Sequence, residues 1–108
     1  MARIARAFPN LQIVCHHGFY PRVHEIIGVA FRYENVFLVP DMYIFLPGSS
    51  LYVEAANGFM ADQLIFGSSY PFRPMGQTID DFINLGLSDY ALERAFYLNA
   101  NRVLNLDL

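Results

Sequence analysis

Three short apolar runs, each followed by a segment with helical spacing, constrain the fold of this chain more than any other feature. The runs cover residues 11–18, 35–40 and 63–69. Strands that are apolar on both faces and are separated by helices are typical of a parallel sheet. The sequence therefore predicts an α/β fold of three consecutive βα units with parallel strands and right-handed crossovers.

The segments between and after these runs carry the expected helices. They are predicted at residues 22–34, 50–62 and 78–86, and one or two more helices follow Ser88, which is suited to cap the first of them. A parallel sheet of three strands with helices on one side leaves its other face open. A chain of 108 residues should therefore form one domain at most, or a part of a larger one.

The composition excludes several classes of function. The chain is 55% hydrophobic and 16% charged, its net charge is −3, and its seven basic residues form no cluster, which argues against nucleic-acid binding. The longest apolar stretches fall far short of the ~20 residues that cross a bilayer. The only cysteine, Cys15, lies inside an apolar run, as is typical of a buried thiol in a reducing compartment. We expect a cytoplasmic protein that binds neither nucleic acid nor membrane.

Side-chain alternation assigns two faces to the first and third strands. The face expected to pack under the helices carries Leu11, Ile13, Cys15, Leu64 and Phe66. The face expected to point inward carries Gln12, Val14, His16, Ile65, Gly67 and Ser69. His16 and Ser69 thus share a face at the carboxyl ends of two strands, where active sites lie in parallel α/β folds. His17 should point away from His16.

Four separated segments also carry a resemblance to a known family. In order, FPNLQIVCHHG, NVFLV, ADQLIFGSSYPF and NANRVLNL are similar to the C-terminal part of the amidohydrolase-related family, in the branch of aminocarboxymuconate-semialdehyde decarboxylase. The resemblance covers essentially the whole chain, so residues 1–108 are expected to be a single partial barrel segment. It implies the last three strands of a (β/α)₈ TIM barrel plus C-terminal helices. It also implies metal-dependent hydrolysis or decarboxylation of small carboxylic acids.

The resemblance implies catalytic roles at two strand ends. His16 falls where the family has a histidine that contacts substrate or metal-bound water, and Ser69 falls where the family has an aspartate that binds the metal. The family's divalent metal, Zn²⁺ or Mn²⁺, is also held by an H-x-H pair and a further histidine that have no counterpart here. Since a metal generally needs three or more protein ligands, we expect none to be held by this chain alone, with His16 the nearest candidate. Whether this chain is itself an enzyme stays open.

The residues after the strands are candidates for binding a small, flat carboxylic acid. They are His17, Phe19, Tyr70, Phe72 and Arg73. The guanidinium of Arg73 could pair with a substrate carboxylate, although a solvated loop arginine is an equal alternative. Asp41, after Pro40, could take the place of the missing aspartate or simply begin a turn.

The sequence leaves a second function open beside catalysis. The alternative is a non-catalytic remnant that self-associates or binds a small acidic ligand. Because the inner face would be exposed in a monomer, we expect a homo-oligomer or a partner chain to cover it.

Overall fold

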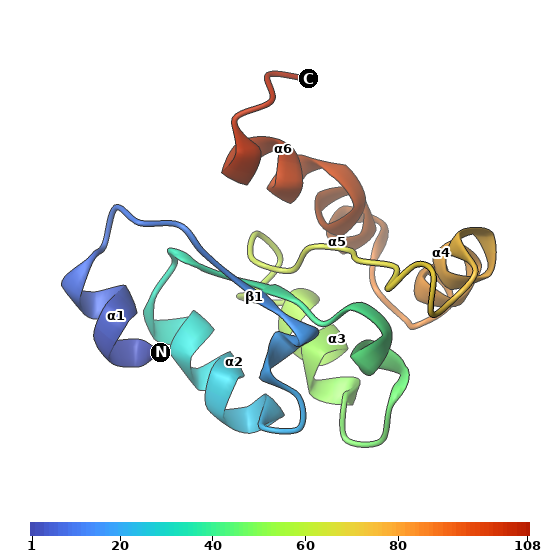
Figure 1. Cartoon of the computed structure of the whole chain (residues 1–108), viewed down its shortest axis with the longest axis horizontal. Coiled ribbons are helices and arrows are strands. Elements are labelled where there is room, and N and C mark those ends of the chain that lie inside the picture. The colour runs from blue at the N-terminus through green and yellow to red at the C-terminus, as the bar shows by residue number, and fades with distance from the viewer.

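A computed structural model describes all residues of the chain, 1–108, and places two short parallel strands between two groups of helices. Figure 1 shows α1, α2 and α3 on one side of the strands and the segment of α5 and α6 on the other. No helix is long and apolar enough to span a membrane. The elements in chain order are α1 (Ala2–Ala7), β1 (Ile13–His16), the 3₁₀ turn η1 (His17–Phe19), α2 (Val23–Arg32), β2 (Val36–Val39), the 3₁₀ turn η2 (Asp41–Phe45), α3 (Ser50–Ala56), α4 (Met75–Ile83), α5 (Asp89–Glu93), the π-helical turn η3 (Arg94–Leu98) and α6 (Asn99–Leu104).

The sheet contains two strands, so the prediction of a third strand over residues 63–69 is wrong. β1 and β2 pair in parallel, with Ile13 opposite Val36 at the start of the register. The third run contributes a single parallel bridge, between Leu38 and Leu64. The bridge consists of two bonds: the Leu38 N–H donates to the Gln63 carbonyl at 2.8 Å, and the Ile65 N–H donates to the Leu38 carbonyl at 2.9 Å.

Both neighbouring positions of this bridge are blocked. Towards the carboxyl end, the next donor on the β2 side would be Pro40, which has no backbone N–H. The Phe66 N–H points away from β2 and donates to the Ala95 carbonyl in η3, at 2.9 Å. Towards the amino end, the Val36 carbonyl accepts from Nε2 of the Gln63 side chain, at 2.9 Å. The third run therefore follows the expected parallel path without forming a continuous ladder.

The main hydrophobic core lies between the strands and α2, α3 and α4. From the strands it receives Cys15, Leu38 and Leu64, as the alternation predicted for Cys15 and Leu64. Leu11 is an exception, since it precedes β1 and is exposed. Its carbonyl accepts a hydrogen bond from Nδ2 of Asn35 at 2.9 Å, which holds the chain in a turn before the strand begins.

A smaller core covers part of the opposite face. Phe37, Val39 and Ile65 are buried there, with Ala100 and Val103 of α6 packed against them. The inner face predicted to be open is thus partly covered by the chain's own last helix. Val14 on the same face keeps 37% of its surface exposed.

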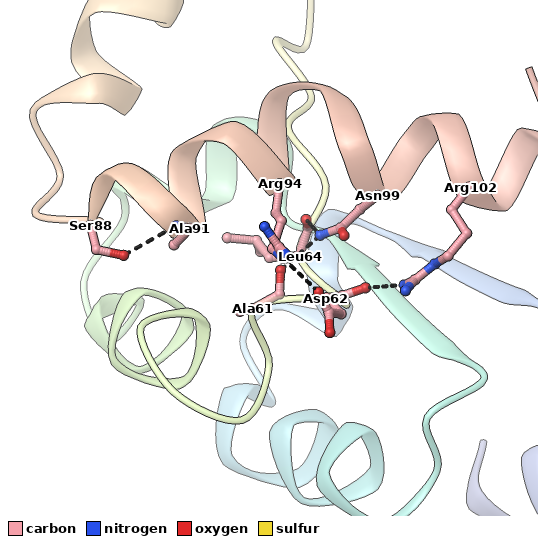
Figure 2. Close-up of polar contacts among 8 residues, drawn as sticks. All are labelled: Ala61, Asp62, Leu64, Ser88, Ala91, Arg94, Asn99 and Arg102. Atoms are coloured by element: carbon pink, nitrogen blue, oxygen red, sulfur yellow. Dashed lines mark hydrogen bonds and ion pairs between the residues drawn. The ribbon is translucent and has the colours of Figure 1, made fainter. Parts of the chain in front are cut away.

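The last helical segment begins where the sequence predicted. Oγ of Ser88 accepts a hydrogen bond from the Ala91 N–H at 3.1 Å, which satisfies one free donor of the first turn. α5, η3 and α6 then follow one another directly, as Figure 2 shows. The π turn was not predicted, because one extra residue in a helix leaves no clear mark on the apolar spacing.

Side chains of this segment hold the third run in place. Nδ2 of Asn99, which is buried, donates to the carbonyls of Ala61 and Leu64 at 2.8 and 2.7 Å. Nη2 of Arg102 donates to the Asp62 carbonyl at 2.6 Å (Figure 2). Side chains of the helix therefore satisfy three backbone carbonyls at the start of the third run.

Candidate functional site

A pocket of about 570 Å³ opens on the inner face, towards the carboxyl ends of the strands. His16 and Ser69, predicted as catalytic, both line it. The full lining is Val14, His16, Val39, Asp41, Ile65, Phe66, Gly67, Ser69, Ala100, Val103 and Leu104. Gln12 instead lines a separate polar hollow of about 440 Å³ with residues such as Glu34 and Arg102. The structure thus brings together most of the side chains expected to point inward, in a pocket that is mainly apolar.

A short hydrogen bond beside this pocket joins His17 and Asp41. Nδ1 of His17 lies 2.7 Å from Oδ2 of Asp41. Because a carboxylate can only accept hydrogen bonds, Nδ1 carries the hydrogen and Nε2 of the imidazole stays free. The ring of Tyr43 meets the imidazole edge to face, with 5.1 Å between ring centroids. The ring of His17 is therefore held from two sides.

Sequence analysis did not predict this pair. Asp41 was expected either to replace the missing aspartate or to begin a turn, and His17 was a candidate for binding substrate. The missing signal is conformational: His17, Asp41 and Ser69 follow three successive strand segments, and all have left-handed backbone, with φ of 64°, 50° and 61°. Side-chain alternation holds only for extended backbone, so it does not say where these side chains point. Such conformations in residues other than glycine are uncommon and tend to gather at functional sites.

The two predicted catalytic residues have different surroundings. The side chain of His16 is exposed and makes no hydrogen bond within the chain. Oγ of Ser69 accepts a hydrogen bond from the Met42 N–H at 2.9 Å and so connects the turn after the third run to η2. The Ser69 hydroxyl still has its own hydrogen to donate. Their catalytic roles stay predictions.

The residues predicted to bind substrate do not line the pocket. Phe19 in η1, and Tyr70 and Phe72 in the turns after the third run, are exposed. Nη2 of Arg73 lies 2.5 Å from Oδ2 of Asp81, and its guanidinium carbon lies 4.4 Å from the ring centre of Phe45. Arg73 therefore anchors its loop to α4, an arrangement that neither of the two sequence-based alternatives anticipated. Substrate binding by these residues stays a prediction.

Tyr52 supports the turn that carries His17. This role was not predicted from the sequence either. Its hydroxyl donates to the Gly18 carbonyl at 2.5 Å. Burial raises the pKa of Tyr52 to about 12, and the nearby Tyr20 and Asp41 add to the effect. A side chain at position 18 would bring its Cβ to 2.8 Å from the Tyr52 hydroxyl oxygen, and φ there is +56°. Glycine is therefore required beside this tyrosine.

The chain's own side chains do not complete a metal centre. No group of three or more histidine, cysteine, aspartate or glutamate residues is placed to hold an ion. In the pocket, His16 and Asp41 are the residues of these types. Two such ligands fall short of the three or more that hold a catalytic divalent ion.

Comparisons with known proteins agree with a barrel-like arrangement. The family model described as amidohydrolase matches residues 1–106. A solved TIM-barrel protein from Bordetella bronchiseptica, itself uncharacterised, is 42% identical and superposes with a TM-score of 0.92. The match covers 96% of this chain and 37% of that one, so the chain spans little more than a third of that protein's length. No curated protein matches the chain.

Proposed function

Because this chain belongs to the amidohydrolase family, we propose that it forms one wall of the active site of a TIM-barrel enzyme. The proposed reaction is hydrolysis or decarboxylation of a small carboxylic acid. The observation that carries the proposal is the pocket itself, on which residues at the carboxyl ends of three successive strand segments converge: His16, Asp41 and Ser69. In TIM barrels the active site lies at the carboxyl ends of the strands.

The chemistry of these side chains suggests how they would divide the work. His16 is free of internal hydrogen bonds and can contact a substrate or transfer a proton. Ser69 can donate a hydrogen bond, but its hydroxyl cannot serve as a base as the family's aspartate would. Proton transfer on this wall is therefore assigned to histidine.

The family is typically metal-dependent, and a divalent ion would supply Lewis acidity and an activated water. His16 and Asp41 alone do not fit such an ion, because the chain offers no third ligand beside them. Any metal of the whole enzyme would need most of its ligands from residues outside these 108. The roles proposed above for the wall do not depend on it.

The proposal is testable in a chimaera in which this chain replaces the matching segment of the Bordetella barrel. Turnover would be measured over a panel of small aromatic and aliphatic carboxylic acids. We expect His16→Ala to lower kcat/KM by about 100-fold or more, as is typical for loss of a proton-transfer group. His24→Ala is the matched control, since His24 is exposed on α2 and lies outside the pocket. A folded chimaera without turnover, or equal effects of the two variants, would contradict the proposal.

A second candidate is a non-catalytic module that self-associates or binds a small acidic ligand. It is favoured by one observation: β1 is paired on one side only, and Val14 within it stays partly exposed. An unpaired strand edge next to apolar side chains is a typical site of association. A second copy or a partner chain would then cover the part of the inner face that α6 leaves open.

A further inference from the structure

The two oxygens of Asp41 have unequal partners. Oδ2 is bonded to Nδ1 of His17 at 2.7 Å. Oδ1 is buried and has no hydrogen-bond partner, the one such side-chain atom in the chain, and the side chain as a whole is 9% exposed. A buried carboxylate oxygen without a donor is unfavourable, and such atoms in native proteins generally mark a ligand, water or functional site.

The surroundings of Asp41 hold it firmly at the pocket. The Met42 N–H, one residue on, is fixed by Oγ of Ser69 at 2.9 Å. Gly67 leaves the space that Asp41 occupies, since a Cβ there would lie 3.3 Å from Cβ of Asp41 and only 2.7 Å from Cγ1 of Val39. Asp41 is therefore a built part of the pocket wall and not a mobile surface carboxylate.

The charges at the pocket do not favour an anion. No arginine lines it. Arg73, the arginine predicted to bind a carboxylate, is paired with Asp81 at 2.5 Å and also donates from Nε to Oγ1 of Thr78 at 3.1 Å. A ligand carboxylate in the pocket would meet the negative charge of Asp41, with the imidazole of His16 as the one basic side chain in the lining.

From these observations we propose that the carboxylate of Asp41, whose Oδ1 lacks a donor within the chain, accepts a hydrogen bond from the ligand, whose end in this pocket is a hydroxyl or ammonium group on an apolar body. The inference rests on the proposed function, because it takes the same pocket as the ligand site, and it narrows the substrate class. A substrate acid would carry its carboxylate away from this wall and present an alcohol or amine to it.

The test uses the full 108-residue chain and three ligands of similar size: benzylamine, benzyl alcohol and benzoate. Amide shifts of the labelled chain would be followed by NMR during titration. Benzylamine and benzyl alcohol are expected to shift the amides of His16, Val39 and Ser69 saturably. Benzoate should bind at least about tenfold more weakly, because it lacks a donor and is repelled by Asp41. This comparison needs no variant and so does not depend on how well a mutant folds.

A variant then tests the carboxylate of Asp41. Asp41→Asn keeps the shape of the side chain but removes its charge. It should therefore weaken the binding of benzylamine by about tenfold. Asp80→Asn, on the exposed face of α4, changes net charge equally and should leave binding unchanged.

Three outcomes would overturn the inference. Benzoate binding as tightly as benzylamine at the same amides would contradict the ligand class while leaving the pocket as the site. Shifts at these amides on adding Zn²⁺, lost in Asp41→Asn, would make Asp41 a metal ligand instead. If none of the ligands shifts the pocket amides, the proposed function loses its site as well.

Discussion

Tyr52 carries the clearest pH-dependent contribution of any single residue. Its pKa is about 12 in the folded chain against 10.0 for a free tyrosine. Between these values the folded state holds the proton more tightly than the unfolded state. The stabilisation is therefore complete below about pH 10 and is lost as the pH rises towards 12. We expect the midpoint of urea unfolding to fall over this range.

Tyr52→Phe should remove this alkaline loss, because no titrating group is left there. Below pH 10 the same variant should lower the free energy of unfolding by about 1–3 kcal/mol, since the buried Gly18 carbonyl loses its donor. Tyr70→Phe, at an exposed position, is the control and should behave as the native chain. An unchanged alkaline slope in Tyr52→Phe would assign the effect to another group.

Cys15 provides a second prediction at this scale. The side chain is buried under α2, and burial raises the pKa of its thiol. Since the thiolate is the reactive form, a thiol reagent should modify Cys15 only when β1 opens. The labelling rate should therefore rise with denaturant in parallel with unfolding. Labelling under native conditions as fast as that of an unfolded chain would show that the helix-facing side of β1 is not packed.

At the scale of elements, the Gln63 side chain joins α2 to β2. Its Nε2 donates to the carbonyls of Ala30, Tyr33 and Val36 at 2.7, 3.2 and 2.9 Å. Gln63→Ala would leave buried carbonyls without a donor and should lower the free energy of unfolding by about 2 kcal/mol or more. Gln77→Ala, on the exposed side of α4, is the matched control. Similar losses in the two variants, measured by denaturant unfolding, would contradict this bridging role.

Gln63 also illustrates which elements of the fold can be predicted from the sequence. The helices and the paths of β1 and β2 follow from apolar spacing, which is local to each segment. The loss of the third strand depends on Pro40, which has no backbone N–H to donate, and on the Gln63 side chain, which occupies the Val36 carbonyl. No local pattern contains that information. Prediction from periodicity therefore gave the right path for residues 63–69 and the wrong pairing.

The candidate site divides in the same way. His16 and Ser69 were predicted to share a face because alternation fixes the side of a strand, and both line the pocket. The bond between His17 and Asp41 could not be predicted, because it begins where the strands end and joins residues 24 apart. Left-handed backbone at both positions turns the side chains towards each other, and a hydrophobicity pattern does not record it.

At the scale of the whole molecule, the open face of the sheet is the main feature still without a partner. α6 packs on Phe37, Val39 and Ile65, yet Val14 and the outer edge of β1 remain uncovered. In the Bordetella relative the matched region is 37% of a longer barrel protein. In a closed barrel every strand is paired on both sides, so an edge like that of β1 does not occur.

We therefore expect the 108-residue chain to self-associate through this edge, and Val14→Lys to prevent it. A lysine there places a charge on β1 itself, which disfavours pairing of its free edge with another chain, and the site is exposed enough to tolerate it. Ile83→Lys, at an exposed position on α4, adds the same charge elsewhere and should still associate. Sedimentation over a range of concentrations distinguishes these results, with circular dichroism to verify folding. A native chain that stays at 12.3 kDa at every concentration would contradict the prediction. Equal loss of association in both lysine variants would show that the contact surface does not involve the edge of β1.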